Sequence, residues 1–184
     1  RQRQMCIRDR TCWFVMRDLG RTSLDKSYYK LFKDNGFEAY TPLKWQLVVK
    51  NGKRSRVQVP VIRDLLFVHD VRSRIEAFIQ KYSAIQFRYV RGAYCCPMVV
   101  PEADMNRFIR VTDSTDSPEY YTPCDITPNM CGRRIRIIGG PLDGCEGKLV
   151  TVRGSKRRRI MVSLLNLLSV AVEVKPEYIQ FIED

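Results

Sequence analysis

The sequence contains little of what metal binding and catalysis require. It has one histidine, His69, and no two of its seven cysteines form a Cys-x-x-Cys pair. A structural zinc site needs closely spaced cysteine and histidine ligands, and nucleophilic catalysis needs a base and a group that orients it. Neither His69 beside Asp70 nor the adjacent Cys95 and Cys96 supplies that combination. We therefore expect no metal, no cofactor and no enzymatic activity.

Long apolar runs are also missing. No stretch approaches the roughly 18 consecutive apolar residues of a membrane-spanning helix. Residues 1–10 alternate charged and polar side chains without the apolar block of a signal peptide, so we expect a disordered or non-native leader there. The odd number of cysteines, without the spacing of a disulfide framework, indicates reduced thiols. We expect a monomeric cytoplasmic protein that does not bind membranes.

Acidic residues are the minority among the charged ones. The chain has 32 lysines and arginines against 20 aspartates and glutamates, which gives a net charge of +12. Such a charge attracts polyanions, because a protein that neutralises phosphates releases their condensed counterions. Nucleic acid is therefore the partner that the composition favours.

The first part of the chain has the pattern of a mixed domain in the order β, α, β, β, α, β. Apolar runs indicate strands, apolar residues three and four apart indicate helices, and Asn51-Gly52 between two extended arms predicts a hairpin. The expected elements are strands at 12–19, 37–49, 56–59, 61–68 and 85–90, and helices from Ser23 to Asn35-Gly36, at 75–82 and from Pro101-Glu102 to about residue 113. We expect an α+β domain at residues 11–113, with helices covering an antiparallel sheet.

The rest of the chain changes character. Residues 114–131 contain three prolines among serine, threonine and aspartate, which is typical of a linker. Short β-type runs then follow, separated by glycine, proline and charged residues, and they predict a small all-β barrel at residues 132–184. The expected strands are 134–138, 147–152, 159–165, 170–174 and 179–182.

Residues 132–152 resemble the KOW motif, in which an alternating strand, a glycine-rich turn and a second alternating strand follow one another. Gly140, Gly144 and Gly147 are expected to turn the backbone with positive φ. The resemblance implies that the barrel is an SH3-like KOW domain. Ribosomal proteins also carry this motif, so an RNA-binding or ribosome-associated KOW protein is the alternative reading of the chain.

Three earlier segments resemble successive landmarks of the N-terminal (NGN) domain of the NusG family. They are Trp13-Phe14-Val15, residues 35–42 and residues 60–68. With the KOW motif, the resemblance covers nearly everything after Thr11. Four further segments, 48–54, 66–69, 97–101 and 105–111, are similar to the UpxY branch, NusG paralogues of Bacteroidetes that are associated with capsular polysaccharide operons.

The resemblance implies a transcription elongation factor or antiterminator. In this family the N-terminal domain binds the clamp helices of RNA polymerase and suppresses pausing or termination. The matching positions for this apolar contact are Ile62, Leu65, Phe67 and Val99. Residues 62–65 are Ile-Arg-Asp-Leu where the family has Phe-Pro-Gly-Tyr, which indicates a specialised paralogue. Core packing is the alternative for each position, because a strand turns half its side chains inward.

Further contacts are expected outside the polymerase. The hairpin tip carries Lys50, Lys53, Arg54 and Arg56. These cations are expected to meet phosphates of upstream or non-template DNA, with a solvated basic loop as the alternative. The resemblance places Leu164 and Leu165 in the KOW loop that contacts a small-subunit ribosomal protein or termination factor Rho. A second basic turn at 156–159 is expected to bind nucleic acid or the ribosome, or only to aid solubility.

Overall fold

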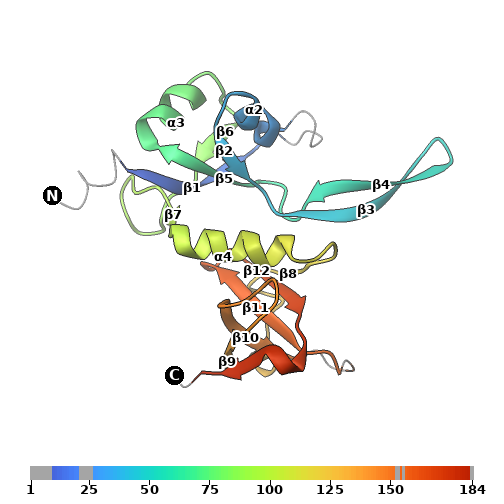
Figure 1. The fold of residues 1–184 in the computed structure, drawn as a ribbon. Helices are drawn as coiled ribbons and strands as arrows, with labels where there is room; N and C mark the ends of the chain where they lie inside the picture. Colours follow the sequence, from blue (N-terminus) through green and yellow to red (C-terminus); the bar gives the residue numbers. More distant parts are fainter. Residues whose placement is uncertain (1–9, 21–26, 152–153, 155, 183–184) are drawn as a thin grey trace. The chain divides into compact units, whose positions relative to one another are not determined.

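The computed structural model (Figure 1) describes residues 10–20, 27–151, 154 and 156–182. The chain divides into two compact units, residues 1–102 and 103–184. The division falls at the start of the third expected helix, whereas the sequence indicated a first domain that ends at residue 113. The expected domain limits stay a prediction. Among the described residues, no helix combines the length and the apolar character needed to cross a membrane.

The first unit is built on a five-stranded antiparallel sheet. Its strands are β1 (Thr11–Asp18), β2 (Glu38–Tyr40), β5 (Leu65–Val71), β6 (Ile85–Phe87) and β7 (Val99–Val100). β1 pairs with β5, β6 and β7, while β2 pairs with the far side of β5. The residues Trp13–Met16 at the middle of β1 are all buried, which explains the uninterrupted apolar run in that segment.

Two helices, α2 (Tyr28–Asp34) and α3 (Arg72–Ile79), cover one face of this sheet (Figure 1). Phe32 of α2 and Ile75 of α3 are fully buried in one apolar cluster with Phe14 of β1. Neighbouring rings in this cluster meet edge-on or tilted, as Phe32 and Phe37 do at a centroid distance of 5.2 Å. The expected arrangement of helices on one face of an antiparallel sheet is confirmed.

One boundary in the first unit agrees with the sequence prediction and another does not. The first helix ends where the sequence predicts, at Asn35 followed by Gly36 with φ of +77°; its expected cap, Ser23, lies outside the described residues. The strand expected at 61–68 is wrong in its first half, because residues 61–64 form a turn in which the Leu65 N–H donates to the Ile62 carbonyl (3.2 Å).

The hairpin predicted around Asn51-Gly52 is confirmed as a separate two-stranded ribbon. β3 (Leu43–Lys50) and β4 (Lys53–Pro60) pair antiparallel over their whole length. Asn51 and Gly52 have φ of +50° and +74°, the left-handed conformation that a two-residue turn of this kind requires at both positions. The ribbon extends away from the main sheet of the first unit (Figure 1).

The second unit contains one helix and a six-stranded antiparallel sheet. Its elements are α4 (Glu102–Asp113), β8 (Glu119–Tyr121), a 3-10 turn at Pro128–Met130, β9 (Cys131–Ile137), β10 (Glu146–Val150), β11 (Arg159–Leu164), β12 (Leu168–Glu173), a 3-10 turn at Pro176–Tyr178 and β13 (Ile179–Phe181). The expected linker therefore includes strand β8, which pairs with β12. The strand order is β13-β9-β10-β11-β12-β8, and no pairing joins β8 to β13 among the described residues. A closed KOW barrel is not confirmed.

The KOW-like segment forms the hairpin of β9 and β10, and its glycines serve two different purposes. Gly140 and Gly144 have φ of +72° and +76° in the turn, as expected. The expectation of positive φ is wrong for Gly147, which lies within β10. A Cβ atom there would lie 2.5 Å from the carbonyl oxygen of Met161 and 2.7 Å from Cγ1 of Ile160. Gly147 is required because β11 approaches β10 too closely for a side chain.

Candidate interaction surfaces

The four residues proposed from the sequence for an apolar contact do not form one surface. Leu65 and Phe67 are 2% and 0% exposed. They are two residues apart in β5, so they lie on one face of the main sheet, the face of Val15, which pairs with Phe67. Val99 pairs with Phe14, so it lies on the opposite face and packs against the helix-covered core. Ile62 is half-buried in the turn before β5. Ile62 and Val99 are therefore the two of the four that keep appreciable exposed area, and they lie on different elements.

The turn that presents Ile62 is fixed by Asp64. The Asp64 carboxylate lies 3.5 Å from Nε of Arg17 and 3.6 Å from Nη2 of Arg88. Its carbonyl oxygen accepts a hydrogen bond from the Asp18 N–H (3.1 Å). The aspartate thus ties the turn to β1 and to the segment after β6, through ion pairs that are each weak at a surface but share one carboxylate.

His69 and Asp70, adjacent in β5, bond to different partners. His69 Nδ1 lies 2.6 Å from Oε2 of Glu38, and its ring stacks on Trp13 with centroids 4.8 Å apart. Asp70 accepts a hydrogen bond from Nη1 of Arg74 (2.5 Å). Both side chains connect strands or a helix within the first unit, and they do not form the hydrogen-bonded pair that acid–base catalysis uses.

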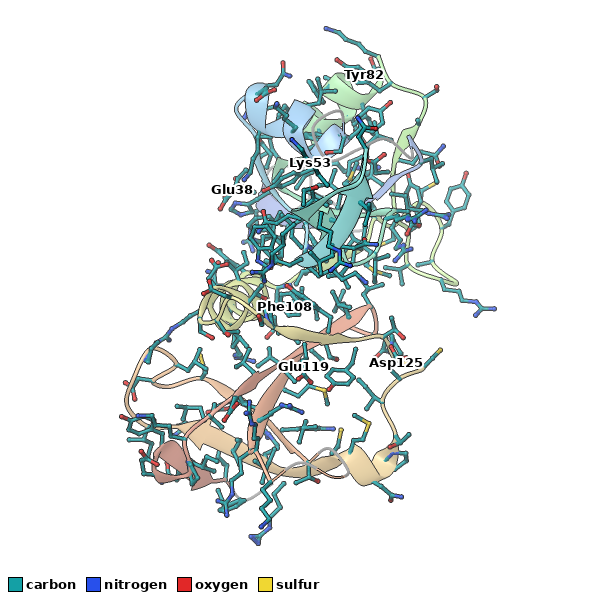
Figure 2. The ribbon with its side chains drawn as sticks, turned by 90° about the vertical axis from the view of Figure 1, so that its right-hand side faces the viewer. Glu38, Lys53, Tyr82, Phe108, Glu119 and Asp125 are labelled. Carbon is teal, nitrogen blue, oxygen red and sulfur yellow. The ribbon has the colours of Figure 1, made fainter. Side chains whose placement is uncertain are left out.

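The basic residues of the hairpin tip are divided between the two faces of the ribbon. Residues paired across a ladder share a face, so Arg54 and Arg56, opposite Val49 and Leu47, lie on one face, and Lys53 lies on the other. Position 50 is paired with Lys53, while the side chain of Lys50 lies outside the described residues. Figure 2 views the ribbon from the side of its tip and labels Lys53.

An apolar stripe on the ribbon was missed by the sequence reasoning. Trp45, Leu47 and Val49 of β3 are 44%, 71% and 65% exposed and share the face of Arg54 and Arg56. The Arg56 guanidinium lies over the Trp45 ring at 4.6 Å, within the range of a cation–π contact. The available signal was the largely apolar run from Trp45 to Val49, without any helix or further strand predicted to cover it.

The two leucines proposed in the KOW loop differ in accessibility. Leu164 ends β11 and is 0% exposed, so it belongs to the core of the second unit. Leu165 is 41% exposed in the turn to β12 and has φ of +48°. A positive φ is costly for a leucine, and such strain is concentrated at functional positions. Only Leu165 is available for a partner.

The second basic turn is partly neutralised. Arg159 Nη2 lies 3.0 Å from Oε1 of Glu119, and Arg157 Nη1 lies 3.1 Å from Oε2 of Glu173. Lys156 and Arg158 are exposed and make no ion pair with another described residue. The number of cations available for a polyanion is therefore smaller than the sequence indicates.

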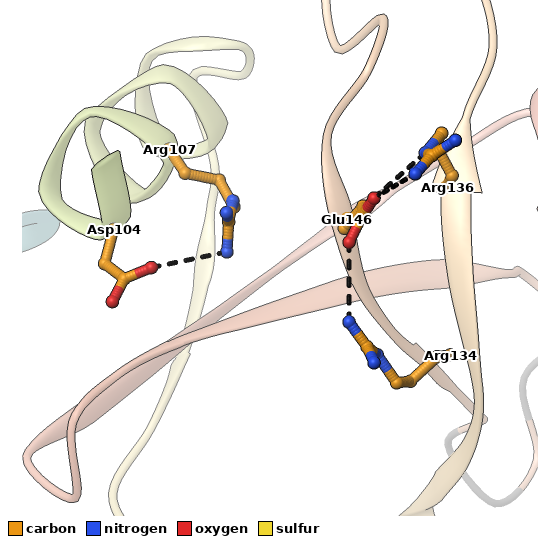
Figure 3. A network of polar contacts seen from close by, with 5 residues as sticks. All are labelled: Asp104, Arg107, Arg134, Arg136 and Glu146. Atoms are coloured by element: carbon orange, nitrogen blue, oxygen red, sulfur yellow. Dashed lines mark hydrogen bonds and ion pairs between the residues drawn. The ribbon is translucent and has the colours of Figure 1, made fainter. Parts of the chain in front are cut away.

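Arginines also converge on the KOW-like hairpin (Figure 3). Glu146 of β10 accepts hydrogen bonds from Nε of Arg136 (3.0 Å) and, at a longer distance, from Nη2 of Arg134 (3.4 Å). The hydrogen bond from Arg136 holds the pKa of the Glu146 carboxyl below its usual range. On α4, Arg107 lies 3.5 Å from Asp104. The Glu146 contacts hold β9 to β10, and the Arg107 contact lies within α4. All three arginines have a carboxylate partner, so this group is structural.

Comparison with known proteins gives one kind of match. No protein-family model and no curated protein matches this chain. Among solved structures, the chain is similar to NusG from Thermotoga maritima, with 13% sequence identity and a TM-score of 0.49, over 95% of this chain and 98% of that one.

Proposed function

We propose that this chain is a NusG-type transcription elongation factor or antiterminator that binds RNA polymerase and catalyses no reaction. The observation that carries the proposal is the order of its recognisable parts. The KOW-like hairpin of β9 and β10, with its sterically required Gly147, follows a sheet-and-helix unit. The three NusG-like segments supply β1, β2 and β5 of that unit, so the resemblance lies in structured elements.

The proposed polymerase contact is centred on Ile62. Asp64 connects its turn to Arg17 and Arg88, and the Ile62 side chain keeps exposed area. Leu65 and Phe67 support this part of the sheet from buried positions, and Val99 supports it from the opposite face. A partly exposed apolar residue on a fixed turn can bind a partner without a cost in backbone ordering.

Other partners are proposed on the ribbon and on the second unit. The tip cations Lys53, Arg54 and Arg56, with Lys50, contact phosphates of upstream or non-template DNA. Leu165 contacts a small-subunit ribosomal protein or Rho. The UpxY-like segments support a role at capsular polysaccharide operons, in the cytoplasm of a bacterium.

The test compares Ile62→Asp with Ile138→Asp in the full chain. Ile138 is 51% exposed in the second unit and serves as a matched control. We expect Ile62→Asp to bind purified core RNA polymerase about tenfold more weakly, because a charge replaces an apolar anchor, and Ile138→Asp to bind like the wild type. Pause durations on a defined template should change in parallel. A wild-type chain that neither binds polymerase nor alters elongation would contradict the proposal.

An RNA-binding or ribosome-associated protein is the second candidate. Lys156 and Arg158, which are exposed and form no ion pair within the part of the chain that the structure describes, favour it. In this case the full chain should bind small ribosomal subunits in a way that the double change Lys156→Glu and Arg158→Glu abolishes, while polymerase binding is absent in all variants.

A further inference from the structure

The ribbon has two outer backbone edges. β3 and β4 form a sheet of their own, and no third strand joins them among the described residues. The turn at Asn51-Gly52 makes Lys50 and Lys53 the closing hydrogen-bonded pair, and hydrogen-bonded pairs then alternate along the ladder. The N–H and C=O groups of Leu47 and Val49 therefore point outward from β3.

The two edges are protected to different degrees. Along β4 the outward-pointing backbone groups belong to Arg54, Arg56, Gln58 and Pro60. Charged residues and proline are the means by which proteins keep an edge strand from pairing with another chain. Along β3 they belong to Leu43, Trp45, Leu47 and Val49, which carry no charge. The edge of β3 is left open, whereas the edge of β4 is blocked.

The open edge coincides with the apolar stripe. Trp45, Leu47 and Val49 have outward backbone groups and also expose their side chains on a single face of the ribbon. A strand that pairs with β3 would place every second side chain beside this stripe and the others on the opposite face, where β3 carries Lys44. Tryptophan and arginine, which lie together on the stripe face, are the residue types that contribute most to protein interfaces.

Charge identifies the kind of partner. Residues 43–60 include five lysines and arginines and no acidic residue. A second copy of this ribbon is disfavoured, because like charges would face each other across the pairing. A nucleic acid would satisfy the cations, but it has no backbone N–H and C=O ladder to pair with the edge. An acidic protein segment can pair with the open edge, lie beside the apolar stripe and neutralise the cations.

We propose that the open edge of β3 binds an extended acidic segment of another protein, which adds a third strand to the ribbon. The bound segment alternates apolar and acidic residues. Its apolar side chains lie beside Trp45, Leu47 and Val49, and its carboxylates lie on the face of Lys44 and Lys53. This inference is independent of the polymerase contact at Ile62.

Tryptophan fluorescence of the full chain measures this binding directly. The chain has two tryptophans, of which Trp13 is 2% exposed and Trp45 is 44% exposed, so a change in emission on binding reports Trp45. The probe is a synthetic peptide of about ten residues, matched to the length of β3, in which glutamate alternates with leucine or valine. Its controls are a peptide of the same composition without the alternation, the alternating peptide with lysine for glutamate, and a single-stranded oligonucleotide. Among the peptides, saturable binding of the first alone is expected, and the oligonucleotide, which the tip cations can bind, is expected to leave the backbone edge of β3 unpaired.

A pair of variants separates strand addition from simple charge attraction. Leu47→Lys adds a positive charge on the stripe, and Val57→Lys adds the same charge on the opposite face, at a residue 37% exposed. Strand addition predicts that Leu47→Lys weakens binding of the acidic peptide about tenfold and that Val57→Lys does not weaken it. Charge attraction alone predicts tighter binding by both, and that result would overturn the proposal.

Amide hydrogen exchange locates the new hydrogen bonds. In the free protein the amides of Leu47 and Val49 should exchange fast, because they point outward, while those of Gln46 and Val48 are already bonded to β4. The peptide should slow the exchange of Leu47 and Val49. Peptide binding without this protection, or the same protection produced by the oligonucleotide, would assign the open edge to another class of ligand.

Discussion

At position 147 the second unit has room for a hydrogen atom but not for a methyl group. We expect Gly147→Ala to destabilise that unit by about 2–3 kcal/mol, because β11 would have to move away from the new Cβ atom. The matched control is Gly144→Ala, where a Cβ meets nothing within 4 Å and the cost of about 1 kcal/mol comes from positive φ alone. Exchange rates of amides in β10 and β11 measure both effects. An equal loss in the two variants would show that the close approach does not matter.

Leu165 combines exposure with an unfavourable backbone conformation. Asparagine tolerates positive φ better, so Leu165→Asn is expected to stabilise the second unit by about 0.5–1 kcal/mol. The same change should weaken binding of a small-subunit ribosomal protein or Rho, if Leu165 is the contact. Thermal unfolding and a binding titration test the two effects separately. A destabilised variant would indicate that the leucine side chain packs more than its 41% exposure suggests.

Among the elements, the edge strand β8 should respond to alkaline pH. Burial raises the pKa of Tyr120 to about 12. The folded pKa lies above the unfolded value near 10, so the phenol favours folding below pH 10 and that contribution is lost between about pH 10 and 12. We expect the wild type to lose on the order of 1 kcal/mol more than Tyr120→Phe between pH 9 and 11.5. Urea unfolding at the two pH values measures this; identical losses would contradict the expectation.

The elements that the sequence predicts well are those with local causes. The ribbon follows from Asn51-Gly52, and β1 follows from the apolar run Trp13–Met16. β8 was missed because its three residues are a strand only through pairing with β12, about fifty residues later in the chain. Whether β8 and β13 close a barrel also depends on such distant pairings, which local patterns do not encode.

The sequence predicted only part of the candidate surfaces, because the pairing of strands decides on which face each side chain lies. The sequence places Ile62, Leu65, Phe67 and Val99 in apolar segments, but only the register of β7 on β1 decides that Val99 faces away from Phe67. The pattern likewise locates the tip cations, while the pairing of β3 with β4 divides them between two faces. Leu164 is buried and the adjacent Leu165 is exposed, and this difference depends on the positive φ of Leu165 in the turn.

At the scale of the whole molecule, the net charge of +12 predicts salt-sensitive binding to DNA. Each neutralised phosphate contributes a slope of roughly −0.7 to −0.9 to the dependence of log affinity on log salt. We expect the double change Lys53→Gln and Arg54→Gln to reduce this slope by about 1.5. The control is Lys156→Gln with Arg158→Gln, which removes the same charge from the second unit. Equal effects in the two variants would mean that the hairpin tip has no special role.

The ribbon is anchored at its root. At its root the Val61 N–H donates to the Pro42 carbonyl (2.8 Å), and the hydroxyl of the buried Thr41 donates to the Leu65 carbonyl (2.9 Å). Strands of eight residues carry its tip roughly 25 Å from that root. Because β4 continues directly into residues 61–64, a force that acts on the tip reaches these two hydrogen bonds and the turn that holds Ile62 at the root of the ribbon.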